Sequence, residues 1–223
     1  MAKRDEGSSA RVRSIRAPML RGRSGGGSGL GRPGMRAVRT FAPRGGTRTV
    51  IKGQYTRMTA KNGRRSPSAV QRVKDSAEYY AHRPNEEGQR AYRPAFTTDA
   101  DEMTKHEVAK SIEQSREPYV YRVVMSPGVD MSQEEVREWT REVMERTGHE
   151  KYIGFAHAGE SKHTEHPHAH VLLFTDQKLD TDDFHKLRLV GDHETLNQIR
   201  HQIAAEYERQ QQRQRVSEFD IED

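Results

Sequence analysis

The first 46 residues of this chain cannot supply a hydrophobic core, so the fold must be built from the residues that follow. Residues 1–46 are rich in glycine, arginine and serine and show no apolar periodicity, a pattern typical of a disordered segment. Only 32% of the chain is hydrophobic, which suffices for one core. We therefore expect a disordered basic tail over 1–46, one folded domain over 47–213 and a flexible acidic end over 214–223.

Positive charge is concentrated in the tail. Of the 38 lysines and arginines, 12 lie in residues 1–48, together with only 2 of the 33 acidic residues. Such a segment favours phosphate backbones by releasing their counterions, without selecting a sequence.

Several classes of protein are excluded by what the sequence lacks. No apolar run is long enough to span a membrane, and the N-terminus lacks the apolar stretch of a secretory signal, so we expect a cytoplasmic protein without membrane insertion. The absence of cysteine excludes disulfides, thiolate zinc sites and cysteine nucleophiles. Any metal ion must therefore be bound by histidine, aspartate or glutamate.

Segments typical of strands and of helices are mixed after residue 47. Runs of β-branched and aromatic residues predict strands, whereas apolar residues at helical spacing, with capping residues at Ser66 and Ser132, predict helices. The strands are expected at 49–56, 119–125, 152–157 and 168–175. The helices are expected at 66–80, 101–115, 132–146, 182–187 and 195–213, and residues 84–98 are expected to form a loop with little structure. This mixture favours an α+β fold, one antiparallel sheet with flanking helices.

Five of the 11 histidines lie within residues 157–170, which indicates a metal site. Neutral imidazoles are suitable ligands for manganese, zinc, nickel and similar divalent ions. Alternate residues of a strand face the same side about 6.5–7 Å apart, so His168 and His170 can share one ion. A third histidine along the same strand is too distant, and His166 is therefore expected at the strand entrance.

A third ligand must come from another segment. If strands 152–157 and 168–175 are antiparallel neighbours, His157 lies across from the pair. The three imidazoles would then leave positions open for water or a phosphate oxygen, as a catalytic ion requires. His163 and His166 are the alternatives to His157.

Three segments share one order along the chain with a known family. The first is the run from Tyr79 to Pro84, Tyr-Tyr-Ala-His-Arg-Pro, the second is the strand from Tyr121 to Pro127, and the third is the block from His157 to Val171. They resemble, in turn, the Tyr-x-x-His-Arg-Pro run, the arginine-headed strand ending in Ser-Pro, and the histidine motif of the plasmid relaxases. These mobilisation nucleases belong to the HUH endonuclease superfamily, and the resemblance covers roughly residues 49–200. The acidic residue common two positions after the family's first histidine is Gly159 here.

The resemblance implies a metal-dependent endonuclease and strand transferase that nicks single-stranded DNA at a transfer origin and mobilises a plasmid or integrative element. In relaxases a divalent ion on three histidines polarises the scissile phosphate. A tyrosine attacks the phosphate and stays linked to the 5′ end. The resemblance further implies a relaxase-like palm, Mn²⁺ or Mg²⁺ as the ion, and accessory mobilisation and coupling proteins as partners.

The resemblance assigns the nucleophile to Tyr79. The helical pattern agrees, because Tyr80 continues the apolar stripe of Val73 and Ala77 and is better explained as a core residue. Tyr80 remains the alternative nucleophile.

Cationic residues near these tyrosines are expected to support the reaction. His82 and Arg83 follow the tyrosines closely, where positive charge would favour a phenolate and hold phosphate. Arg83, Arg122 and Lys52 are expected to bind DNA.

Two other functions fit the same residues. A relative that no longer nicks would hold single-stranded nucleic acid without cutting it. A rolling-circle replication initiator would use the same chemistry with a tyrosine on a helix after the histidines, for which Tyr207 is the candidate.

Overall fold

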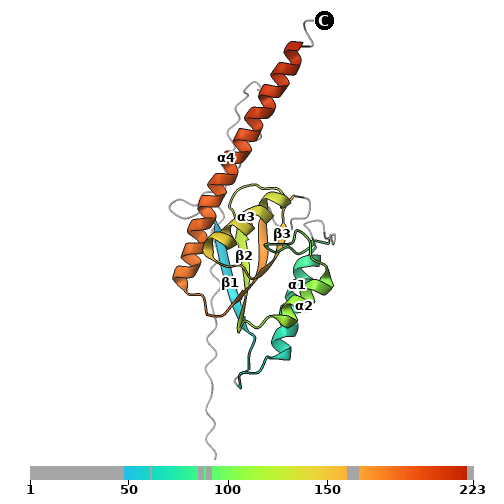
Figure 1. Ribbon diagram of the computed structural model, residues 1–223, viewed down its shortest axis with the longest axis vertical. Coiled ribbons are helices and arrows are strands. Elements are labelled where there is room, and N and C mark those ends of the chain that lie inside the picture. The colour runs from blue at the N-terminus through green and yellow to red at the C-terminus, as the bar shows by residue number, and fades with distance from the viewer. Residues whose placement is uncertain (1–47, 61, 85–87, 89–91, 160–165, 220–223) are drawn as a thin grey trace, which may run out of the picture. The chain divides into compact units, whose positions relative to one another are not determined.

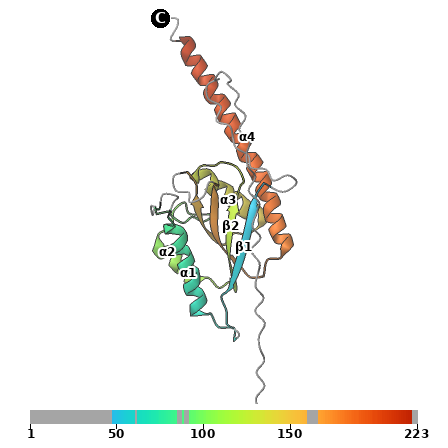
Figure 2. The same ribbon diagram turned by 180° about the vertical axis from the view of Figure 1, so that it is seen from behind.

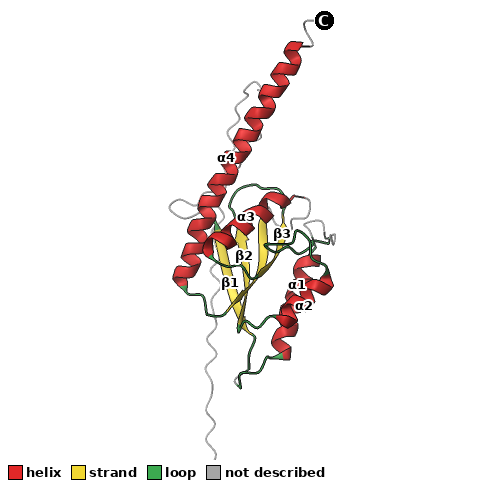
Figure 3. Cartoon of the chain, in the orientation of Figure 1, coloured by secondary structure: helices red, strands yellow, loops and turns green. Residues whose placement is uncertain are grey.

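The computed structural model describes residues 48–60, 62–84, 88, 92–159 and 166–219. In chain order the elements are β1 (Val50–Arg57), α1 (Pro67–His82), α2 (Lys105–Gln114), β2 (Tyr119–Ser126), α3 (Gln133–Thr147), β3 (Tyr152–His157), β4 (His168–Thr175) and α4 (Thr181–Phe219) (Figure 1, Figure 3). The tail expected over 1–46 and the last residues, 220–223, lie outside the described residues.

The four strands form one antiparallel sheet in the order β1-β2-β4-β3, which confirms the expected α+β class. The register aligns one residue from each strand in a row across the sheet. Lys52 lies opposite Val124, Val124 opposite His170, and His170 opposite Phe155. Because directly opposed residues of antiparallel strands point to the same face, these four side chains share one face.

The two faces of the sheet are covered differently. On one face, α3 and α4 bury a core around Trp139 that includes Val123, Val171 and Leu187. On the other face, α1 and α2 pack over β3 and β4 (Figure 1, Figure 2). On that second face a group of residues from β1 and β2 remains exposed: Val50, Lys52, Gln54 and Val124. We call this group the open sheet face.

Capping residues fix where two helices begin, as the sequence predicts. The hydroxyl of Ser66 accepts a hydrogen bond from the amide of Ala69 at the start of α1. Ser132 forms a capping box with Glu135 at the start of α3, and Gly148 ends that helix in the left-handed conformation.

The sequence expectation for the C-terminal helices is wrong. Residues 182–187 and 195–213 were expected as separate helices, but both belong to the single helix α4, which continues to Phe219. The helix α4 continues through Gly191, whose lack of a side chain permits close packing against Trp139 and Thr49. Its carbonyl accepts a hydrogen bond from Trp139 Nε1 (3.0 Å), and a Cβ there would lie 2.6 Å from Thr49 Cγ2. Although α4 is long, neither it nor any other described helix is apolar enough to cross a membrane.

The segment before α2 also differs from expectation. The helix begins at Lys105 rather than Asp101, because Thr104 and Glu107 form a capping box. Within the expected loop 84–98, Phe96 pairs with Gly154 of β3 through two backbone hydrogen bonds of 2.8 and 2.9 Å. This segment therefore protects the edge of the sheet beyond β3.

Gly154 should be intolerant of a side chain. A Cβ at Gly154 would lie 2.4 Å from the ring of Phe96, which is completely buried. Overpacking of this kind typically costs about 1–3 kcal/mol, so Gly154→Ala should lower the free energy of unfolding by that amount in chemical denaturation. Gly53→Ala in β1 is the matched control, since its nearest contacts would be side-chain atoms at 3.2 Å and its loss should be smaller. Equal losses would contradict this packing.

Candidate metal centre

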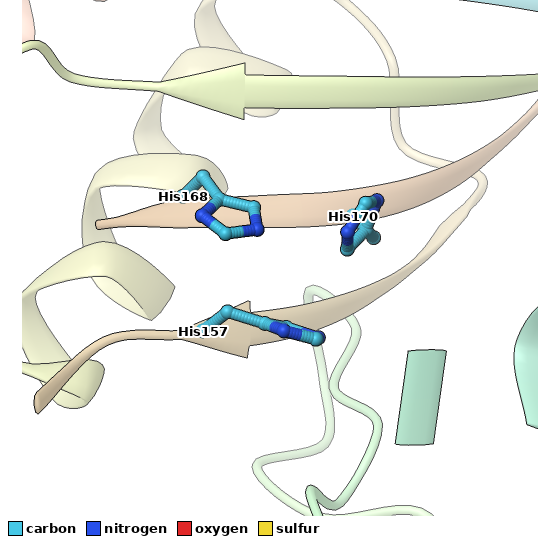
Figure 4. A group of neighbouring side chains, drawn as sticks. All are labelled: His157, His168 and His170. Atoms are coloured by element: carbon cyan, nitrogen blue, oxygen red, sulfur yellow. The ribbon is translucent and has the colours of Figure 1, made fainter. Parts of the chain in front are cut away.

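The pairing of β3 with β4 gathers the three expected histidines. His157 lies directly opposite His168, and His170 faces the same side two residues along β4. One ring nitrogen from each histidine lies within 4.8 Å of the other two. The ring centroids are 5.0–5.2 Å apart (Figure 4). These three imidazoles can therefore converge on a single ion.

The histidines are buried and oriented. Their exposed fractions are 0% for His157 and 5% for both His168 and His170. His168 Nδ1 lies 2.9 Å from the carbonyl oxygen of His166. Because a carbonyl only accepts, Nδ1 carries the proton and the neutral ring keeps its lone pair on Nε2. A backbone partner of this kind commonly orients a metal-binding histidine.

The surroundings of His168 favour its neutral form. Burial lowers the pKa of His168, and the positive charges of Arg83 and Arg93 lower it further, against the hydrogen bond to the His166 carbonyl, which raises it. Metal binding needs the neutral imidazole, so the lowered pKa of His168 favours the form that binds an ion.

The donor set fits a divalent transition-metal ion. In the described part of the chain the group consists of histidines alone, and imidazole nitrogen is a common ligand for such ions. Of the two alternatives to His157, His163 lies outside the described residues. His166 is exposed and directs its backbone carbonyl to His168.

Tyr80 forms one wall of the centre. Its ring stacks on His170, with centroids 4.2 Å apart and planes 5° from parallel, and it also contacts Phe155 at 5.8 Å. Burial raises the pKa of Tyr80, partly offset by the charges of Arg122 and Arg83. The expectation that Tyr80 packs inward therefore agrees with its contacts, although it packs against a histidine of the site.

Arg83 lies between the histidines and Tyr79. Its Nη1 is 3.4 Å from His170 Nε2, and its guanidinium carbon is 5.3 Å from the centroid of the Tyr79 ring. Tyr79 is 52% exposed. The more accessible tyrosine is thus linked to the centre through a cation.

His82 points to the opposite flank of α1. Its Nε2 lies 3.6 Å from Glu78 Oε1, and its ring lies 5.3 Å from that of Tyr92. His82 lines a cavity of about 320 Å³ between α1 and α2. These contacts place His82 beside α2 and Tyr92, so the structure does not gather this predicted site residue with the three histidines.

The expected DNA-binding residues Arg122 and Lys52 face the same side as the histidines. Arg122 lies opposite Gln54 and Leu172, and its charge acts on Tyr80. Lys52 is exposed at the β1 end of the row that contains His170.

Tyr207 lies on α4, whose packing residues Leu187, Val190 and Ile199 belong to the core on the other face of the sheet. Its side chain is 63% exposed. The helix that carries Tyr207 is thus separated from the histidines by the sheet.

Sequence reasoning missed Arg93, a fully buried residue beside the centre. Its Nη1 donates to the carbonyl oxygen of Arg83 (2.5 Å), and its amide donates to that of Ala81 (2.9 Å). The sequence signal is a repeated pair, Arg83-Pro84 and Arg93-Pro94.

Protein-family models, curated proteins and solved structures contain no match to this chain. Its function must therefore be argued from the residues of the site.

Each of the three histidines should be required for ion binding. Losing an outer partner of a metal ligand typically weakens affinity about 10–100-fold, so replacing a ligand should cost at least about 100-fold. Isothermal titration of Mn²⁺ into His157→Asn, His168→Asn and His170→Asn tests this. His201→Asn, an exposed histidine of α4, is the control and should bind normally. Normal affinity in any of the first three variants would remove that histidine from the centre.

The lowered pKa of His168 predicts an acid-sensitive fold in the ion-free protein. Because the folded pKa lies below the unfolded value of about 6.5, neutral His168 contributes stability above that pH. This stability is lost as the pH falls from about 6.5 through the folded pKa. Urea unfolding of the ion-free protein should show it, and His168→Asn should flatten the decline. An equally steep decline in the variant would contradict the shift.

Proposed function

We propose that this protein is a metal-dependent nuclease of the relaxase type, which nicks single-stranded DNA through a covalent tyrosine intermediate. The observation that carries the proposal is the connection from three buried histidines through Arg83 to Tyr79. It supplies ligands for an ion, a cation for phosphate and an accessible nucleophile in one place. The ordered resemblance of the three sequence segments supports the same reaction.

We propose Mn²⁺ rather than Mg²⁺ as the preferred ion. His157, His168 and His170 would hold it through nitrogen, whereas Mg²⁺ prefers oxygen ligands. When bound, such an ion polarises a phosphate oxygen and offsets charge that develops during displacement.

Tyr79 is the preferred nucleophile. Its oxygen would form a bond to phosphorus as the bond from phosphorus to the 3′ oxygen breaks, leaving a 5′-phosphotyrosine and a free 3′ hydroxyl. The proton lost by the tyrosine is balanced by the proton that the 3′ oxygen gains. Tyr80 is the alternative, but its ring is held against His170 and its raised pKa disfavours the phenolate.

Arg83 is suited to bind the scissile phosphate. A guanidinium can donate two hydrogen bonds to phosphate oxygens at once, and this one lies within 3.4 Å of His170 Nε2. The phosphate would then meet Arg83 and the histidine centre together, beside Tyr79.

The open sheet face offers a path for the rest of the strand. Lys52 and Arg122 supply positive charge for the backbone, and exposed Val124, which lies between Lys52 and His170 in the row, offers an apolar surface to a base. A positively charged surface that follows the backbone is common in proteins that bind single-stranded DNA.

The biological role that we propose follows the relaxase resemblance. The protein would act in the cytoplasm at the transfer origin of a plasmid or integrative element, together with accessory mobilisation and coupling proteins. The basic tail would add affinity for phosphate without selecting sequence.

A binding module without nicking is the second candidate, favoured by the exposed Lys52 and Val124. It would bind single-stranded DNA equally well after chelation and after replacement of the histidines. A rolling-circle initiator would instead need Tyr207.

A denaturing gel tests the reaction. Single-stranded origin DNA with Mn²⁺ should give a protein–DNA adduct that disappears with a chelator. Tyr79→Phe should abolish the adduct because the phenol oxygen forms the bond, whereas Tyr207→Phe should leave it intact. Persistence in Tyr79→Phe with loss in Tyr80→Phe would transfer the role to Tyr80. If neither a nick nor an adduct forms with any origin tried, the nuclease is contradicted and the binding module becomes the favoured function.

A further inference from the structure

Arg93 is among the largest fully buried side chains, and the proposed reaction does not use it directly. With an exposed fraction of 0% it cannot touch DNA. A guanidinium is costly to remove from water unless it is well hydrogen-bonded, so its position beside the metal centre calls for an explanation.

Two hydrogen bonds of Arg93 are made to the end of α1. The helix ends at His82, and Arg83 adopts an extended conformation, as expected for a residue before Pro84. The last carbonyls of a helix lack partners within it. Arg93 donates to two carbonyls of this end, from its amide to Ala81 (2.9 Å) and from Nη1 to Arg83 (2.5 Å). A cation is also favoured there by the helix dipole.

This end of α1 is the part that faces the histidines. Tyr79, Tyr80 and Arg83 lie on its last turn and cap, and the side chain of Arg83 reaches His170 while its carbonyl is held by Arg93. Holding the carbonyl fixes the backbone from which the Arg83 side chain extends. The guanidiniums of Arg83 and Arg93 carry like charges and repel each other. The hydrogen bond from Arg93 to the Arg83 carbonyl keeps the Arg83 backbone in place despite this repulsion.

We infer that Arg93 is a positioning residue, which fixes the backbone of Arg83 so that its guanidinium stands between His170 and Tyr79 to receive a phosphate. The inference takes from the proposed function only that Arg83 binds phosphate of single-stranded DNA. Nicking itself is not required.

A double-mutant cycle on DNA affinity tests the inference. Binding of a fluorescent single-stranded oligonucleotide is measured by anisotropy in the presence of a chelator, so that no nicking occurs. Arg83→Gln should weaken binding about tenfold or more, since it removes charge-assisted hydrogen bonds. Arg93→Met should weaken it similarly, and the double variant no further than Arg83→Gln alone.

Arg65→Met is the matched control. Arg65 also donates to a helix carbonyl, that of Ile112 in α2 (2.7 Å), and burial lowers its pKa. Its replacement should lower the melting temperature without weakening DNA binding beyond about twofold. If Arg93→Met folds poorly, Arg93→Lys keeps the charge but not the planar fork, and the same non-additivity with Arg83→Gln is expected.

Two outcomes would overturn the inference. One is unchanged DNA affinity in folded Arg93→Met or Arg93→Lys, and the other is a double variant whose loss equals the product of the single losses. Nicking is measured separately with Mn²⁺. If the losses of affinity are non-additive as expected but no nicking occurs, the proposed function alone is contradicted. If the losses are additive and nicking is normal, the role of Arg93 alone is contradicted.

Discussion

The antiparallel register between β3 and β4 is the constraint on which the site depends. It sets His157 directly across from His168 and leaves His170 on the same face. A slip of one strand by one residue would turn that strand's side chains to the opposite face, and the three nitrogens could no longer meet. The pairing of Phe96 with Gly154 supports β3 at the edge of the sheet. The packing of Tyr80 on His170 supports β4 on the face that α1 covers.

The site is rich in positive charge for a place that could bind a cation. Three imidazoles bring no negative charge, and the charges of Arg83 and Arg93 act on His168. A dication would therefore be bound against repulsion unless an anion joined it. A phosphodiester would supply negative charge to the ion and to Arg83 together. For this physical reason the arrangement is better suited to bind a phosphate substrate than to serve as a purely structural metal site.

Much of the centre could be predicted because it depends on short-range periodicity. The two-residue repeat of a strand assigns His168 and His170 to one face, and a hairpin-like return brings back His157. The direction of His82 could not be predicted, because it depends on which flank of α1 meets α2. Arg93 was missed because the repeated Arg-Pro pair does not show that its amide and side chain donate to the backbone carbonyls of Ala81 and Arg83. The continuity of α4 through Gly191 depends on close packing against Trp139 and Thr49, contacts between residues far apart in the chain.

In the proposed site, the three histidines hold an ion to which a DNA phosphate binds. Pulsed electron paramagnetic resonance of the Mn²⁺ complex measures this directly, because nuclei of bound atoms couple to the metal spin. We expect nitrogen couplings from imidazole that weaken in His168→Asn, and a phosphorus coupling that develops when single-stranded DNA is added. Mn²⁺ without imidazole couplings, or a phosphorus signal that never develops at saturating DNA, would contradict it.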